Sequence, residues 1–419
     1  MTRPDASMPL QRVVVTGQGC VGPLGLTASE SWRAMRAGQP GIAPITRVPA
    51  DQVRMPIAAE VKGFDASRYF DEKRLLLLDP TAQYALVAAR EALAQAGLDF
   101  SDAAAAQRAA VVIGTGAGGE TTHDESVRRL YQDRQPRVHP LTIVRSMFSA
   151  LASQLCLEFK LRGPAFVVSS ACASANHALA NAFALLRCGD ADVALAGGSE
   201  ACLTLGVVKA WEAMRVLADD TCRPFSRQRR GLVLGEGAGI FVLETLEHAQ
   251  QRGARILAEL AGVGMTSDAV DIVSPDAGGA GRAMQAALRQ AGLAPEDVDY
   301  INAHGTGTQL NDTTETRAIR AVFGAHADRL AVSSTKSMHG HALGAAGALE
   351  LVAVLGALMD GVVPPTINYL GHDPDCDLDV VPNTAAVRPV RAALSNSFAF
   401  GGLNAVLALR RWDPGSPYS

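Results

Sequence analysis

Cys172 has the surroundings of a candidate nucleophile. It lies between a strand-like run, AFVVSS, and a helix-like run, ANHALANAFALL. A cysteine at a helix N-terminus is close to unpaired amide groups and to the positive end of the helix dipole, and both favour the thiolate. The pattern therefore indicates a thiol that could act as a nucleophile. Taken alone, the position is also typical of a buried structural cysteine.

Glycine-rich turns in the second half of the sequence supply histidine and lysine side chains. His304 lies in AHGTGT, and Lys336, His339 and His341 lie in STKSMHGHALGAAG. A further glycine turn, NSFAFGGLNA, could offer backbone N–H groups. Because each segment follows a strand-like run, we predict that these turns converge on one site.

The elements that must position these turns have an α/β pattern. Short apolar runs that end in glycine turns, such as RVVVTGQG, AAVVIGTGAGG and DVALAGG, alternate with long Ala/Leu-rich segments. Apolar strands that alternate with helices favour a sheet buried on both faces. Thr27 followed by Glu30 is a capping-box pattern, so we expect an early helix to begin there.

Two segments resemble each other within the chain. VSSACASANHAL (168–179) and VSSTKSMHGHAL (332–343) share VSS and HAL at identical spacing, and a strand ending in GTG lies upstream of each. The simplest alternative is coincidence in an Ala/Gly-rich sequence. We favour a duplicated α/β unit, in which Cys172 and Lys336 occupy equivalent turns that face a shared site. The stretch between GTG and VSS is longer in the first half, which indicates an insertion at about 120–150.

This interpretation divides the chain into two related halves and a Pro/Gly/Ser-rich tail. The predicted parts are 1–260, which carries the cysteine, 261–412, which carries the histidines and lysine, and 413–419.

Composition excludes several classes of function. The net charge of -4 gives no global basic field for nucleic acid or anionic lipid, so we expect neither nucleic-acid binding nor membrane insertion. Seven cysteines without a CxxC pair argue against a disulfide framework or a thiolate zinc cluster. With no signal-peptide pattern at the N-terminus, a reducing cytoplasm is the expected location. The apolar run Leu349 to Met359 is too short to span a bilayer and predicts a buried helix.

As a set, the motifs resemble those of β-ketoacyl-acyl-carrier-protein synthases of the type II elongating class, in the thiolase-like superfamily. The matching segments follow the family's order across nearly the whole chain: SSACASANHAL, LVLGEGAGIFVLE, AHGTGTQLND, STKSMHGHALGAAGALE and NSFAFGGLN. The stretch WEAMRVLADDTCRPFS also resembles nodulation-type synthases, which make specialised acyl chains. The resemblance implies a thiolase-like α/β fold with αβαβα layers, in which two duplicated halves share one core.

The implied reaction is a decarboxylative Claisen condensation that elongates an acyl chain in fatty-acid biosynthesis. Cys172 would take the acyl group from acyl-ACP, where ACP is acyl carrier protein. His304 and His341 would assist loss of carbon dioxide from malonyl-ACP and stabilise the enolate. No cofactor is implied beyond the 4'-phosphopantetheine arm of the carrier, and no metal. The alternatives are a specialised lipid, polyene or polyketide pathway, or a non-catalytic chain-length partner.

Supporting roles also follow from the resemblance. The backbone amides of Cys172 and Phe400 would form an oxyanion hole, and Phe400 would gate the acyl pocket. Lys336 and its associated acidic residue, Glu315, would organise the charges of the site, although a structural ion pair is an equal alternative. Trp211 would line the acyl pocket, where an indole limits depth, or belong to the ordinary core.

Three residues depart from the family pattern. Ala399 stands where relatives often have Gly, and Leu403 where they have Thr, so both changes bear on motion of the gating loop. His339 replaces a small polar residue and adds an ionisable group near the site.

The expected partners are a carrier protein and a second copy of the chain. Because carrier proteins are acidic, we expect a basic docking patch, with four candidates: Lys73, Arg74, Arg137 and Arg215. The family forms homodimers, and the insertion is a candidate for that contact.

Three other chemistries fit the motifs less well than a condensing enzyme does. A zinc site of Cys172, His304, His339 and His341 lacks a second thiolate or a carboxylate. A degradative thiolase normally has a second catalytic cysteine in its C-terminal loop, and NSFAFGGLN has none. Initiating synthases usually pair the cysteine with one histidine and an asparagine, so two histidines favour the elongating class.

Overall fold

The computed structural model describes residues 10–413, and one ten-stranded sheet runs through it. Its strands are β1 (Val13–Val21), β4 (Ala109–Gly114), β5 (Ala165–Val168), β6 (Val193–Glu200), β7 (Gly237–Thr245), β8 (Ala258–Ser267), β9 (Tyr300–Asn302), β10 (Ala331–Ser333), β13 (Ala392–Ala399) and β14 (Leu403–Arg411). Their order is β10-β9-β13-β14-β8-β1-β7-β6-β4-β5. Two short ribbons pair β2 (Ala43–Pro44) with β3 (Ile57–Ala58), and β11 (Val362–Val363) with β12 (Ala386–Val387).

The sheet consists of two halves with the same topology. From the central antiparallel pair β1–β8, the order outward is β7, β6, β4, β5 on one side and β14, β13, β9, β10 on the other. On each side the first two pairings are antiparallel and the next two are parallel. This correspondence confirms the duplicated α/β unit. The boundary predicted after residue 260 falls inside β8, and of the predicted tail only Asp413 lies within the described residues.

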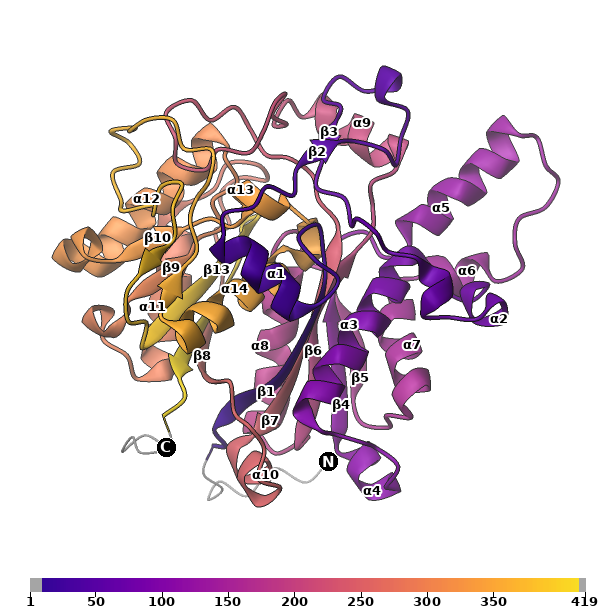
Figure 1. Cartoon of the computed structure of the whole chain (residues 1–419), viewed down its shortest axis with the longest axis horizontal. Coiled ribbons are helices and arrows are strands. Elements are labelled where there is room, and N and C mark those ends of the chain that lie inside the picture. The colour runs from indigo at the N-terminus through magenta and orange to yellow at the C-terminus, as the bar shows by residue number, and fades with distance from the viewer. Residues whose placement is uncertain (1–9, 414–419) are drawn as a thin grey trace.

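Helices cover both faces of the sheet and fill the space between its halves (Figure 1). They are α1 (Ala28–Arg36), α2 (Glu72–Leu75), α3 (Pro80–Ala96), α4 (Ala103–Gln107), α5 (Glu120–Val127), α6 (Thr142–Ser146), α7 (Ala150–Phe159), α8 (Ser174–Arg187), α9 (Leu205–Ala213), α10 (Leu246–Gln251), α11 (Ala277–Ala291), α12 (Gln309–Phe323), α13 (Lys336–His339) and α14 (Ala346–Asp360). Helix α3 packs outside β1 and β7, α11 packs outside β8 and β14, and α8 and α14 contact strands of both halves. These contacts give the predicted αβαβα layers.

Helix α14 is the most deeply buried helix of the central layer. The 18-residue segment Leu343–Asp360 is apolar and long enough to cross a membrane, but 89% of it is buried inside the protein. Its apolar character is therefore explained by the core, as predicted for the run Leu349 to Met359. The prediction that this run is too short to span a bilayer is wrong, because the apolar segment extends from Leu343 to Asp360. One carboxylate, Glu350, lies fully buried in this helix.

Glycine pairs let the outer helices approach the two central strands. A Cβ atom on Gly19 of β1 would lie 1.9 Å from the Ala88 carbonyl oxygen of α3, and one on Gly264 of β8 would lie 2.0 Å from the Ala283 oxygen of α11. Only a residue without a side chain permits this distance. The pattern of two glycines separated by one residue, Gly17 and Gly19 in β1 and Gly262 and Gly264 in β8, thus recurs at equivalent places in the two halves.

The start of α1 follows the predicted cap. Thr27 Oγ1 accepts a hydrogen bond from the Glu30 amide at 3.1 Å. The Glu30 carboxylate accepts from the Leu26 amide at 2.9 Å, one residue before the cap.

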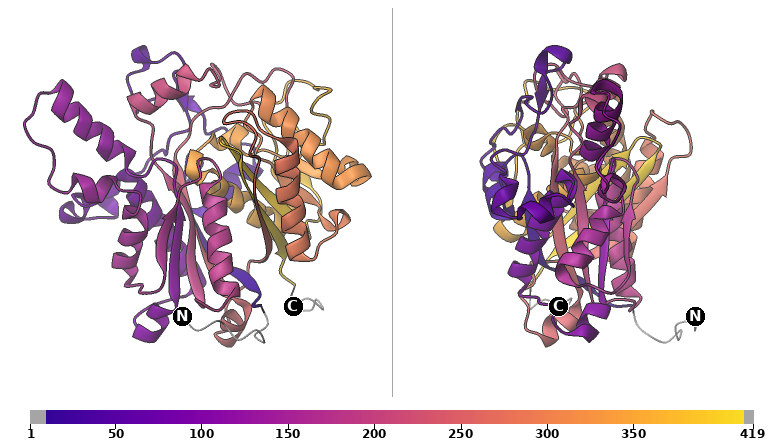
Figure 2. Two further views of the ribbon diagram at one scale, coloured as in Figure 1. Left: turned by 180° about the vertical axis from the view of Figure 1, so that it is seen from behind. Right: turned by 90° about the vertical axis from the view of Figure 1, so that its right-hand side faces the viewer.

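The predicted insertion, residues 120–150, forms an arm that extends from the body of the molecule (Figures 1 and 2). It contains α5, a π-helical turn at Arg128–Gln132 and α6. Large apolar side chains are exposed on it, including Tyr131 (75%) and Ile143 (68%). Exposed apolar area of this kind marks a contact surface.

Candidate active site

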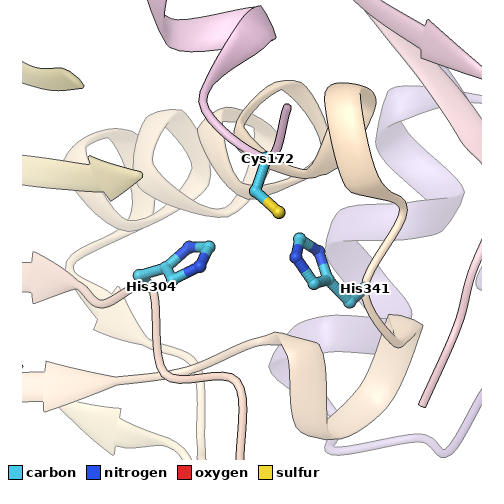
Figure 3. Close-up of side chains that lie close together, drawn as sticks. All are labelled: Cys172, His304 and His341. Atoms are coloured by element: carbon cyan, nitrogen blue, oxygen red, sulfur yellow. The ribbon is translucent and has the colours of Figure 1, made fainter. Parts of the chain in front are cut away.

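The predicted turns converge in the structure. Cys172 lies between β5 and α8, His304 follows β9, and His341 follows α13. The Cys172 sulfur and a ring nitrogen from each histidine all lie within 4.8 Å of one another. In Figure 3 the sulfur points toward the space between the two imidazoles. The nucleophile thus comes from one half of the fold and the histidines from the other.

A strained turn presents Cys172. Ala171 has a φ of +50°, a left-handed conformation that residues with a side chain rarely adopt. The Ser174 hydroxyl holds the turn, because it donates to the Ala171 carbonyl at 2.6 Å and accepts from the Ser170 amide at 2.9 Å. Helix α8 begins at Ser174, so the sulfur lies just before its N-terminus.

Burial decides the ionisation of the thiol. It raises the pKa of Cys172 to about 12, although the Lys336 ammonium and the amides of Cys172 and Phe400 oppose this increase. The amide of Cys172 at the helix end lowers the pKa, as expected from the sequence, but desolvation by burial acts in the opposite direction and is larger. Both amides expected to form the oxyanion hole do face the sulfur.

The two histidines are neutral. Burial, and secondly the positive charge of Lys336, hold the pKa of His304 and of His341 well below the ordinary value of 6.5. Lys336 Nζ donates to the His304 carbonyl at 2.7 Å and lies 3.3 Å from His304 Nδ1. An ammonium has only donors, so Nδ1 accepts and the ring proton lies on Nε2. His341 has no hydrogen-bond partner for either ring nitrogen among residues 10–413.

The carboxylate that pairs with Lys336 is Glu350, not Glu315. Lys336 and Glu350 form a fully buried ion pair, and burial raises the pKa of Glu350 to about 7. Glu315 instead accepts hydrogen bonds from the amides of His304 and Gly305 at 2.9 and 2.8 Å, so it holds the turn that carries His304. Sequence reasoning missed Glu350, although an acid in the middle of an apolar helix requires a buried partner.

The gating loop keeps its two flexible positions. Gly401 and Gly402 have φ values of +84° and +69°, whereas Ala399 ends β13 with ordinary backbone and packs against Cys172. Alanine therefore costs no strain at position 399. Leu403 is the first residue of β14 and is 36% exposed.

A cavity of about 500 Å³ leads from the three residues to the surface. Thr306, Thr308 and Phe400 line its walls, and Arg215 and Arg230 are among the charged residues that line it. Trp211 is absent from its lining residues within the described chain. Its ring instead lies 6.0 Å from the ring of Phe400.

The other three docking candidates lie away from this cavity. Lys73 and Arg74 are on α2, and Arg74 pairs with Glu158 at 3.4 Å. Arg137 is on the arm, where its carbonyl accepts a hydrogen bond from Arg129. Only Arg215 of the four lines the cavity that holds Cys172.

His339 lies in the core beside the site. Its Nδ1 is 2.9 Å from the Gly340 carbonyl oxygen and its Nε2 is 2.9 Å from Thr335 Oγ1. Burial lowers its pKa to about 3, so it adds no charge. Both ring nitrogens of His339 have hydrogen-bond partners. His339 therefore does not join Cys172, His304 and His341, and the four-ligand zinc site does not form.

Two family models match the chain. Residues 10–249 match "Beta-ketoacyl synthase, N-terminal domain" and residues 257–370 match "Beta-ketoacyl synthase, C-terminal domain". Nodulation protein E of Rhizobium sp. (strain N33) is 52% identical over 401 residues, which are 96% of this chain and 99% of the relative. The 3-oxoacyl-[acyl-carrier-protein] synthase 2 of Staphylococcus aureus (strain N315) is 42% identical over 410 residues, with the same coverage.

Solved structures agree with these matches. The ishigamide ketosynthase/chain length factor superposes with a TM-score of 0.92 at 37% identity, covering 96% of this chain and 100% of that one. A type II polyketide ketosynthase, AntDE, in complex with its acyl-carrier protein AntF, gives a TM-score of 0.87 at 34% identity with the same coverage. The chain therefore belongs to the beta-ketoacyl synthase family, whose members are acyl-transferring condensing enzymes that use carrier-bound substrates and no metal.

Proposed function

We propose that this ketosynthase extends an acyl chain held on Cys172 with a malonyl group delivered by an acyl carrier protein. The observation that carries the proposal is a buried thiol that faces two neutral imidazoles, all within 4.8 Å, in a cavity of about 500 Å³. The cavity admits a pantetheine arm, and the buried inner end excludes water from the reacting groups.

The first step transfers the acyl group to the enzyme. Cys172 Sγ attacks the thioester carbonyl, a new carbon–sulfur bond forms, and the carrier's carbon–sulfur bond breaks. The thiol proton leaves with the carrier's sulfur. The amides of Cys172 and Phe400 face this position and stabilise the oxygen that becomes negative.

The second step forms the carbon–carbon bond. Malonyl thioester loses carbon dioxide, and the electron pair moves into an enolate. His304 Nε2–H donates to the enolate oxygen, and His341 provides a second neutral imidazole within 4.8 Å of the sulfur. The enolate carbon attacks the acyl carbonyl on Cys172, the acyl carbon–sulfur bond breaks, and the released thiolate takes up one proton from solvent.

Lys336 supports the second step through the two histidines and does not line the cavity. Its ammonium holds the proton of His304 on the nitrogen that faces the sulfur, and its charge disfavours a second proton on either catalytic histidine. Glu350 compensates that charge inside the core.

We infer an accessory synthase for a specialised acyl chain, because identity to Nodulation protein E (52%) exceeds that to the synthase 2 of S. aureus (42%). General fatty-acid elongation, expected from the resemblance, is the alternative. Product analysis with carrier-bound primers of graded length and unsaturation separates them. Equal use of all saturated primers would contradict the specialised role.

The edge of the sheet and the exposed apolar arm at 120–150 support a homodimer. Strand β5 is the edge strand of the first half, and its Phe166 is 37% exposed. An unpaired strand edge beside the apolar arm is suited to a second copy of the chain, which would extend the sheet.

If Cys172 is the nucleophile, acyl-ACP should acylate this cysteine alone. Wild type incubated with acyl-ACP should gain the mass of one acyl group, and Cys172→Ala should gain none. Cys156→Ala, which removes a half-buried thiol on α7, should be labelled like wild type. Intact-mass spectrometry measures all three. A wild-type protein that every carrier-bound chain leaves unlabelled would make the chain a non-catalytic partner.

The charge of Lys336 predicts a shift in pH dependence. Lys336→Met removes a positive charge that lowers the pKa of both catalytic histidines, so their pKa rises and the acid limb of malonyl-ACP decarboxylation moves to higher pH. The variant should also lose about 3–5 kcal/mol of unfolding free energy, because Glu350 loses its partner. Carbon dioxide release against pH and urea denaturation provide the measurements.

A double variant separates these two effects. Lys336→Met/Glu350→Gln should regain most of the unfolding free energy and keep the shifted acid limb. An unshifted limb in both variants would refute the influence of Lys336 on the histidines.

Carrier docking predicts a substrate-dependent loss. Arg215 is exposed at the cavity, so Arg215→Glu should raise the KM for carrier-bound substrates about tenfold through repulsion of an acidic carrier. The KM for a short pantetheine thioester should be unchanged. Arg282→Glu on α11 is the control with an equal change of charge. Equal losses with both substrates would exclude a docking role for Arg215.

The dimer prediction concerns mass in solution. Wild type should scatter light as two 43.8 kDa chains, and Ile143→Asp on the arm should shift the protein toward monomer. Val387→Asp changes a residue that is 87% exposed and lies outside the arm and β5, so it should leave the mass unchanged. A monomeric wild type at micromolar concentration would contradict the proposal.

A further inference from the structure

His341 is aimed at Cys172 without any hydrogen bond from its own ring. Both ring nitrogens lack a partner among residues 10–413. Its ring contacts that of His304 edge-on, with centroids 5.4 Å apart. An imidazole in this position takes its direction chiefly from its backbone, so whatever fixes the backbone at residue 341 also fixes the catalytic geometry.

The peptide unit before His341 is held at both of its polar ends. The His341 amide donates to the Val233 carbonyl at 2.7 Å. The carbonyl oxygen of Gly340, in the same peptide unit, lies 2.9 Å from His339 Nδ1. A carbonyl oxygen can only accept, so His339 carries its proton on Nδ1, and Nε2 accepts from the Thr335 hydroxyl at 2.9 Å.

This peptide unit needs such support because its conformation is unusual. Gly340 has φ +67° and ψ −168°, a region that is essentially confined to glycine. A Cβ atom on Gly340 would lie 2.8 Å from the Ala59 methyl and 3.0 Å from the Val233 oxygen. The chain therefore passes through a narrow space, and rotation of the Gly340 carbonyl would turn the His341 ring.

We propose that His339 is a positioning residue for His341, acting through its Nδ1–H bond to the Gly340 carbonyl. The inference rests on the proposed function of His341 in decarboxylation. A direct acid–base role does not fit, because both His339 nitrogens are engaged and the ring does not line the cavity. Its pKa of about 3 agrees with a ring that stays neutral while its Nδ1–H donates to the Gly340 carbonyl.

Two amide variants separate the two hydrogen bonds of His339. Asparagine places an N–H near the position of Nδ1 and keeps the bond to Gly340, whereas glutamine reaches the position of Nε2 and keeps the contact with Thr335. His339→Gln should lower kcat for carbon dioxide release from malonyl-ACP about tenfold with little change in KM. His339→Asn should stay within about twofold of wild type. Cys172 acylation, measured by intact mass, should be unchanged in both.

A double-variant test distinguishes positioning from general loss of structure. In the His341→Ala background, adding His339→Gln should cause no further loss of the residual decarboxylation, because the residue that it positions is already gone. A further tenfold loss there would overturn the proposal, as would equal activity of His339→Gln and wild type. Should His339→Gln fail to fold, His339→Val, which removes both bonds, is measured in the same two backgrounds.

Carbon dioxide release by wild type and by His339→Gln tests the proposed function and the role of His339 separately. If wild type releases no carbon dioxide from malonyl-ACP, the proposed function fails. If wild type releases it and His339→Gln does so equally fast, the condensing chemistry stands and only the role of His339 is lost.

Discussion

The antiparallel pairing of β1 with β8 is the contact on which the active site depends. It joins Val13, Val14 and Val15 to Leu260, Glu259 and Ala258, and it brings together two halves that carry different parts of the chemistry. The cysteine belongs to the first half and the histidines and lysine to the second. A small rotation at this seam would separate sulfur from imidazole, so the fold reinforces it from the central layer.

Side chains of the first half cross into the second to lock this arrangement. Asn176 of α8 donates to the carbonyls of Ser395 and Ala405 at 3.2 and 3.3 Å. Glu200, at the end of β6, accepts from the amides of Gly116 and Gly344 at 2.7 and 2.9 Å, which ties a turn of one half to the turn after His341. These bonds are buried, so breaking either would leave polar groups unpaired.

Much of the site could be predicted from the sequence because its residues lie in glycine-rich turns at strand ends. The convergence of Cys172, His304 and His341 follows from that pattern together with the duplicated unit. The turns alone do not identify the partner of Lys336, since Glu315 and Glu350 are both acids on nearby helices; the signal in the sequence is the place of Glu350 in the middle of an apolar run. The raised pKa of the Cys172 thiol was missed for a different reason. The helix end is visible in the sequence, but the degree of burial is not.

Burial also explains why the two halves form one unit. Helix α14 contacts strands of both halves, and its residues from Ala346 to Leu358 are buried. Half of the sheet alone would leave one side of this helix exposed to water. The division at residue 260 therefore describes a repeat in the sequence, and the two parts share one core.

The distance along the chain between β1 and its neighbours has a consequence for biosynthesis. β1 ends at Val21, but β7 begins only at Gly237 and β8 at Ala258. On a translating ribosome, the first strand emerges long before either strand that hydrogen-bonds to it. Its edge amide and carbonyl groups stay unpaired and its apolar side chains stay uncovered during that interval, so nascent chains of this protein should depend on chaperones until synthesis passes the midpoint.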